Sequence, residues 1–239
     1  SYHESEYKQI YKRSELCLPC HDMTIRGVDA EITFTEWLDA TSQSMFNVLS
    51  CQECHMPTNL REAAIGGPLR NVHSHRFVGV DIDLSYPVGQ SPLHDLVQDM
   101  LESAVDLQFG YLNFALPDTI ISGDSLIIPI HIKSKTAHSI PSGTSFSREA
   151  WLAVTVTTVT NTIENLWYES GVIGDTEHLE ISDADLLLFT TILQKENNEE
   201  AISVTQTHGI INHSLKAYHS RYHNYRIGLS GVVADFIDI

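Results

Sequence analysis

The sequence contains two short motifs of the same form, Cys-Leu-Pro-Cys-His from Cys17 to His21 and Cys-Gln-Glu-Cys-His from Cys51 to His55. They use all four cysteines of the 239-residue chain, and in each a histidine directly follows the second cysteine. Whatever fold forms must place two thiol pairs and their histidines around the group that they bind. This requirement constrains the chain more than any helix or strand pattern does.

Two such pairs are compatible with disulfides, with a zinc site or with covalently attached haem. Two disulfides that close such short loops would add little stability. A tetrahedral zinc ion is complete with four ligands, whereas the motifs offer six. Haem c uses every residue, because the thiols form thioether bonds to the porphyrin and the histidine binds the iron. The residues predicted to hold two haem c groups are Cys17, Cys20, His21, Cys51, Cys54 and His55. Covalent haem attachment also predicts an extracytoplasmic protein, periplasmic or extracellular.

Each iron then needs a sixth ligand or keeps that position open, and the chain has 13 histidines. His73 and His75 are two residues apart, so they face the same way in an extended segment. His138 lies in a Pro/Gly-rich loop between two strand-like runs. We predict His75, His138 and His73 as iron ligands, with His3 and His94 as weaker candidates. Met23 and Met56 are too close to their own motifs to reach the far side of the ring, and they are expected to pack at its edge.

The chain is acidic, with 31 Asp and Glu against 14 Lys and Arg and a net charge of −17. Such a surface disfavours nucleic acid, because phosphate binding relies on Lys and Arg. No apolar run approaches the ~20 residues that a membrane-spanning helix needs. The composition therefore predicts no nucleic-acid partner and no membrane span in this chain.

The first half predicts helices and loops. Helical spacing covers residues 4–17, 32–51 and 91–110, and Thr33 with Glu36 is placed as a capping box for the second of these helices. Residues 58–72 contain three breakers in a row and are predicted to be a loop.

After residue 116 the sequence pattern changes to short, alternating, strand-like runs that are rich in β-branched residues. Residues 149–160 and 165–173 are expected to form a hairpin across the segment Asn-Thr-Ile-Glu-Asn at 161–165, and more strand-like runs follow. The fold class predicted is α+β, a small helical and loop dihaem domain at 1–115 followed by an antiparallel, immunoglobulin-like β-sandwich at 116–239. The chain ends within a strand-like segment, to which a neighbouring chain could add a strand.

The sequence resembles a group of extracytoplasmic multihaem c-type cytochromes, related to the cytochrome c554 type, in which an immunoglobulin-like β-sandwich follows the haem segment. The resemblance covers roughly residues 14–171 and rests on "SELCLPCH", "TFTEWLDAT", "CQECHMP", "HSHRFVG", "AHSIPSGTSFSREAWLAVTV" and "WYESG". It implies two histidine ligands for each iron, and it implies His75 and His138 as the distal ones. The chain departs from the pattern at Ser142, where relatives often have threonine, and at residues 78–82, where "VGVDI" replaces a Gly-Gly-His stretch.

Three functions fit these features. The first is electron transfer between redox partner proteins, because iron with two histidine ligands leaves no site for a substrate. Self-association into a haem-stacked filament is compatible with it, given the spare histidines and the last strand. The second is a haem enzyme for a small nitrogen oxide or hydroxylamine, which needs an open iron and a donor such as Arg76, although an arginine beside a haem propionate is the simpler interpretation. The third is a binding module in which the haems only brace the fold. An electron carrier that is not an enzyme is the favoured prediction.

Overall fold

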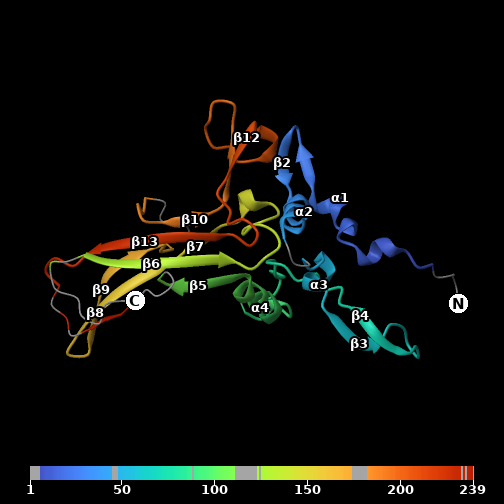
Figure 1. Cartoon of the computed structure of the whole chain (residues 1–239), viewed down its shortest axis with the longest axis horizontal. Helices are drawn as coiled ribbons and strands as arrows, with labels where there is room; N and C mark the ends of the chain where they lie inside the picture. Colours follow the sequence, from blue (N-terminus) through green and yellow to red (C-terminus); the bar gives the residue numbers. More distant parts are fainter. Residues whose placement is uncertain are drawn as a thin grey trace.

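The computed structural model of the chain describes residues 6–44, 48–87, 89–110, 123, 125–173, 182–232, 234 and 236–238. Within these ranges it is a mixture of short helices and several small antiparallel sheets, as an α+β chain should be (Figure 1). The candidate ligand His3 lies outside the described residues.

The helices occupy only the first half of the described chain. The two short 3₁₀ turns η1 and η2 lead into α1, and three further helices follow. Their bounds are η1 Gln9–Lys12, η2 Ser14–Leu16, α1 Leu18–His21, α2 Thr33–Gln43, α3 Cys51–His55 and α4 His94–Ala104. Two more 3₁₀ turns lie in the second half, η3 Ser145–Ser147 and η4 Val204–Gln206. None of the described helices is long and apolar enough to cross a membrane.

The strands of the first half are short. Every strand pair in the described part of the chain is antiparallel. The first four form two hairpins, β1 with β2 and β3 with β4. Their bounds are β1 Met23–Ile25, β2 Val28–Glu31, β3 Thr58–Glu62 and β4 Leu69–His73.

The second half is built mainly from strands. Two three-stranded sheets, in the orders β13-β6-β5 and β14-β8-β9, are accompanied by the pairs β10-β7 and β11-β12. Their bounds are β5 Val105–Phe109, β6 Ser125–Ser134, β7 Ala150–Leu152, β8 Val154–Thr160, β9 Ile163–Ser170, β10 Leu187–Phe189, β11 Thr191–Gln194, β12 Gly209–Asn212, β13 Ser220–Gly228 and β14 Phe236–Asp238.

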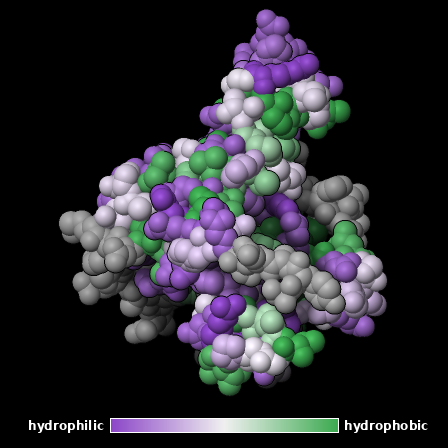
Figure 2. Space-filling model, turned by 90° about the vertical axis from the view of Figure 1, so that its right-hand side faces the viewer, coloured by the Kyte–Doolittle hydropathy of each residue, from purple (hydrophilic) through white to green (hydrophobic). Residues whose placement is uncertain are grey.

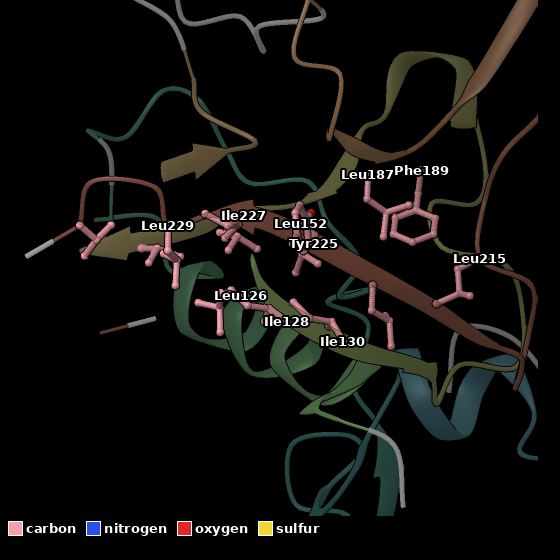
Figure 3. Packing of buried hydrophobic residues seen from close by; sticks show 14 residues of the cluster. Leu126, Ile128, Ile130, Leu152, Leu187, Phe189, Leu215, Tyr225, Ile227 and Leu229 are labelled. Atoms are coloured by element: carbon pink, nitrogen blue, oxygen red, sulfur yellow. The ribbon is translucent and has the colours of Figure 1, made fainter. Parts of the chain in front are cut away.

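The main hydrophobic core lies in this strand-rich half (Figure 3). β6 contributes every second side chain from Leu126 to Ile132, the alternation expected of a strand with one buried face. β8 contributes Val154 and Val156, while β13 contributes Tyr225 and Ile227. Because these strands belong to both three-stranded sheets, one hydrophobic core joins the two sheets.

The predicted hairpin is present, as β8 and β9 pair from Val154↔Ser170 to Thr160↔Ile163. Asn161 and Thr162, which connect them, both have positive φ, 49° and 71°. Tight two-residue hairpin turns of the I′ type need this backbone, and its twist matches that of the strands.

Three local predictions from the first half are wrong. Residues 58–72, predicted as a loop, form the β3–β4 hairpin, and the Gly-Gly-Pro breakers make its turn instead of ending an irregular segment. The helix predicted over 91–110 stops at Ala104, because Val105–Phe109 pairs with β6 as strand β5. The helix predicted over 4–17 is replaced, in its described part, by η1 and η2.

The capping box predicted for α2 is also absent. The N-cap of α2 is Ile32, without a side-chain cap. Thr33 and Glu36 both form hydrogen bonds to other segments, which removes them from capping. A capping box exists at α3 instead, where Ser50 and Glu53 bind each other's backbone and side chain just before the second motif.

Candidate functional site

The two cysteine motifs lie side by side. Each forms one short helix, α1 and α3, and the segment before the first motif is hydrogen-bonded to the start of the second. The hydroxyl of Ser14, which is 2% exposed, accepts the N–H of Cys51 at 3.1 Å, and the amide of Gln52 donates to the carbonyl of Arg13 at 2.8 Å. These two hydrogen bonds hold the two motifs next to each other.

The four cysteines are free thiols, so no disulfide joins them. Burial raises the pKa of Cys17 to about 11, and the neighbouring Cys51 thiol, within hydrogen-bonding reach, adds to the effect. Burial also raises the pKa of Cys54, with the nearby Glu53 carboxylate as a second cause. No group of three His, Cys, Asp or Glu side chains in the described ranges, which include every cysteine, is arranged to hold a metal ion alone.

Beside the second motif, the rings of His55 and His138 lie next to each other. Their centroids are 6.2 Å apart and their planes differ by 21°. Each ring is oriented by a backbone carbonyl: Nδ1 of His55 is 2.5 Å from the oxygen of Val78, and Nδ1 of His138 is 3.0 Å from the oxygen of Ser139. A carbonyl only accepts, so in both rings Nδ1 carries the proton and Nε2 keeps its lone pair. Desolvation lowers the pKa of His138, although the hydrogen bond to Ser139 opposes this. The net lowering of the pKa favours the neutral form of the His138 imidazole.

This spacing fits a shared metal ion. Metal–imidazole bonds are about 2 Å long, so two rings that bind one ion from opposite sides have centroids roughly 6 Å apart. The observed value of 6.2 Å leaves room for an iron atom between the rings. The residues present therefore fit a bis-histidine haem at the second motif.

The other predicted histidines lie elsewhere. Nδ1 of His73 is 2.6 Å from the carbonyl oxygen of Met56, so this ring borders the second motif. His75 is exposed, with its ring 6.1 Å from that of Phe77. His94 begins α4, and its Nδ1 is 3.1 Å from Asp95. The structure thus brings His138 and His73 to the second motif and shows no comparable approach for His75 or His94 within the described residues.

Beside the first motif the partner of histidine is a carboxylate. Nδ1 of His21 is 3.9 Å from Oε1 of Glu31, whose side chain is 6% exposed. Glu31 also accepts the N–H and the hydroxyl of Thr33, at 3.1 Å and 2.6 Å. A carboxylate behind a ligating histidine fixes its orientation and increases its basicity.

Among the residues that border this site, sequence reasoning names Arg76 as a donor or propionate partner but misses several others. Tyr218, on a loop of the strand-rich half, lies close enough to Cys54 that this thiol contributes, after burial, to raising the tyrosine pKa. Glu36 and Ser142 bind each other across the two halves at 2.6 Å. Arg61 and Arg76 line a groove of about 330 Å³ together with Val78, the partner of His55. No local pattern signals these contacts, because each joins segments that are far apart in the sequence.

The sequence matches no protein-family model, and no curated protein is similar to it. One solved structure is similar in fold, the penta-heme cytochrome c552 from Thermochromatium tepidum, with a TM-score of 0.58 and 19% sequence identity. The similarity covers 94% of this chain and 46% of that one, so this chain spans less than half of its length. At this identity the comparison establishes a shared fold over nearly the whole chain.

Proposed function

We propose that this chain is an extracytoplasmic dihaem c-type cytochrome that transfers electrons, with one haem c at each Cys-x-x-Cys-His motif. The observation that carries the proposal is the geometry of the second motif, where His55 and His138 are spaced to bind one iron between them. The fold shared with a penta-heme cytochrome supports it. The haem, once bound, supplies a one-electron couple, and the polypeptide sets its potential through ligands, burial and hydrogen bonds.

The two attachment points are close enough for exchange between haems. The thiols of Cys17 and Cys51 are within hydrogen-bonding reach, and the two motif helices are tied through Ser14. Electrons can therefore pass between the two groups inside one chain, and a redox partner protein needs to approach only one of them.

The axial ligands proposed for the second iron are His55 and His138, with His21 as the proximal ligand of the first. His73 and His75 remain the proposed candidates for the sixth position of the first iron. His73 borders the second motif through its contact with the carbonyl of Met56, whereas His75 is exposed. Arg61 and Arg76 are suited to bind haem propionates, since guanidinium groups bind carboxylates through paired hydrogen bonds.

We also propose the division into a haem segment at 1–115 and an immunoglobulin-like sandwich at 116–239. The joint core of the two three-stranded sheets supports the sandwich. Strand β5, from the first segment, completes a sheet of the second by pairing with β6. The sandwich then serves as the scaffold that presents His138 to the second motif.

Self-association into a filament is part of the proposal, and the β3–β4 hairpin supports it. This hairpin extends away from the strand-rich body (Figure 1), and Leu60, Ile65 and Leu69 on it are 68%, 105% and 66% exposed. Arg61 and Arg70 are paired directly across its strands, and neither forms an ion pair within the described chain. The face that carries the hairpin is turned to the viewer in Figure 2, where apolar and polar residues alternate. In a chain of net charge −17, a basic apolar arm is complementary to the acidic surface of another copy.

The test is a haem-stained denaturing gel, an intact mass and visible spectra of the purified protein. Two covalent haems and a wholly low-spin ferric spectrum are expected. A protein without covalent haem would contradict the proposal. A high-spin component that binds cyanide or nitrite would favour the alternative function, a haem enzyme for a nitrogen oxide or hydroxylamine with Arg76 as a donor.

A further inference from the structure

A chain of hydrogen bonds connects the start of α2 to the segment that carries His138. The hydroxyls of Thr33 and Ser142 are 2.7 Å apart, although they are separated by 109 residues. Thr33 binds Glu31 at 2.6 Å, and Ser142 donates to Glu36 at 2.6 Å. Two carboxylates and two hydroxyls thus bridge the haem-motif half and the strand-rich half.

Within this group of hydrogen-bonded residues, Glu36 contacts the His138 segment at two points. One oxygen, Oε2, accepts the N–H of Ser139 at 3.1 Å and the hydroxyl of Ser142 at 2.6 Å. The carbonyl of the same Ser139 binds Nδ1 of His138 at 3.0 Å. Glu36 therefore anchors Ser139, the residue whose carbonyl orients the imidazole of His138.

Two other features hold the loop in this position. Ile140 exchanges two backbone hydrogen bonds with Leu215, both 2.8 Å, which pin the segment to the loop before β13. Gly143 has φ +79°, and a Cβ at this position would lie 3.1 Å from Oε2 of Glu31. The backbone turns closely past the two carboxylates, and glycine permits both the turn and the approach.

We propose that Glu36 is the positioning residue for His138 and that its negative charge sets the potential of the haem at the second motif. This inference rests on the proposed function, in which His138 binds the second iron. A carboxylate near an iron centre stabilises the ferric state over the ferrous state, because the oxidised centre carries one more positive charge. Glu36 thus has two separable effects, a geometric one through its hydrogen bonds and an electrostatic one through its charge.

Two substitutions separate these effects. Glu36→Gln keeps an amide oxygen with two lone pairs, which can accept from both Ser139 and Ser142, but it removes the charge. Glu36→Leu removes the charge and both hydrogen bonds. Ser142→Ala is a milder geometric variant, because it deletes one of the two bonds and keeps the carboxylate. Glu102→Gln, on the exposed face of α4, is the matched control for loss of one negative charge.

The experiment measures the midpoint potential and the spin state of each haem in the purified holoprotein by spectroelectrochemistry and electron paramagnetic resonance. Glu36→Gln should raise one of the two potentials and leave both haems low-spin. Glu36→Leu should raise the same potential and convert part of that haem to a high-spin, cyanide-binding form. Ser142→Ala should give a smaller high-spin fraction with little change in potential, and Glu102→Gln should match the wild type.

Unchanged potentials and spin states in both Glu36 variants would overturn the inference. An equal shift of the midpoint potential in Glu102→Gln would also overturn the inference, because the loss of a surface charge elsewhere would then have the same effect. If Glu36→Leu does not fold, Glu36→Gln and Ser142→Ala still decide. Failure of the proposed function has a different signature: His138→Ala would then leave both haems low-spin, whatever the Glu36 variants do.

Discussion

The rings of His55 and His138 lie 6.2 Å apart although 83 residues separate them in the sequence. One belongs to a helix of the second motif and the other to a loop between strands of the opposite half. Their Nδ1 atoms are both directed to carbonyl oxygens, which leaves the two Nε2 atoms for a ligand. The strand-rich half thus places one histidine ring directly beside the histidine of the second motif.

The first prediction concerns His138 itself. Replacement by alanine should convert one of two low-spin haems to a high-spin form that binds cyanide or carbon monoxide, because the second iron loses its distal ligand. Absorption and electron paramagnetic resonance spectra measure this. His208→Ala, at an exposed histidine of the same half, is the control and should remain wholly low-spin. Retention of both low-spin signals in His138→Ala would assign the ligand to another residue.

This pair also shows what the sequence can predict about the site. The motif histidines follow from local spacing, and His138 was picked out by its Pro/Gly-rich loop. The network that holds His138 was not predicted, because the same residues, Thr33 and Glu36, also match a capping box. Local rules favoured the cap, whereas tertiary contacts with Ser139 and Ser142 determine the structure.

The fold likewise contains elements that local sequence patterns predict and elements that depend on tertiary contacts. The β8–β9 hairpin is predicted from the β-branched alternation of its first strand, and it is present, although its turn is only the two residues Asn161 and Thr162. The β3–β4 hairpin was missed because both of its faces are exposed, so its strands lack the alternation that marks a buried face. The sequence pattern of Val105–Phe109 continues that of the preceding helix, and only pairing with β6 makes this segment extended.

The second prediction tests the cap of the second motif helix. Ser50→Ala removes the capping box of α3, in which the Ser50 N–H and hydroxyl are bound to Glu53 at 2.7 Å and 2.8 Å. Loss of an N-cap serine costs about 1 kcal/mol of stability. Chemical denaturation followed by circular dichroism measures the loss. Ser42→Ala near the exposed end of α2 should be neutral or slightly stabilising, since alanine is the better helix former there.

The third prediction tests the shared core. Ile128 is fully buried in β6, whereas its neighbour Ile127 is 37% exposed on the other face of the strand. Ile128→Ala should lower the free energy of unfolding by about 2–5 kcal/mol, because it leaves a cavity between the sheets. Ile127→Ala should cost clearly less. Equal losses in the two variants would contradict the packing of β6 against the second sheet.

The fourth prediction concerns pH. Burial acts to raise the pKa of Asp183, but donors from Gly171, Ser170 and Asp185 outweigh it and hold this pKa below its usual value. A carboxyl whose folded pKa is depressed contributes stability above its unfolded pKa and loses it as the pH falls through the folded value. The free energy of unfolding of the wild type should therefore decline below about pH 4, the unfolded pKa of aspartate.

Asp183→Asn should be less stable than the wild type near neutral pH, and the difference should shrink as the pH drops below that value. Urea denaturation at a series of pH values measures both proteins. Asp99→Asn, at an exposed position of α4, serves as the control for loss of one carboxylate. A difference between wild type and Asp183→Asn that stays constant down to the lowest pH would refute the linkage.

The fifth prediction concerns self-association through the β3–β4 hairpin. If this arm binds the acidic surface of another copy, replacement of both Arg61 and Arg70 by glutamate should abolish association, because each copy would then meet only like charge. Replacement of Ile65 at the tip by serine should weaken it by removing an apolar side chain that is 105% exposed. Analytical ultracentrifugation and electron microscopy of the holoprotein at low and high salt measure the assembly, and salt should weaken the wild-type contact through screening.

The control for the arm is a pair of charge reversals elsewhere, Lys195→Glu and Lys216→Glu, which add the same negative charge to the strand-rich half. These variants should associate like the wild type. Wild-type protein that stays monomeric at high concentration and low salt would rule out the filament and leave the arm as a surface for a different partner. Association that survives in the double arginine variant would place the contact on another surface.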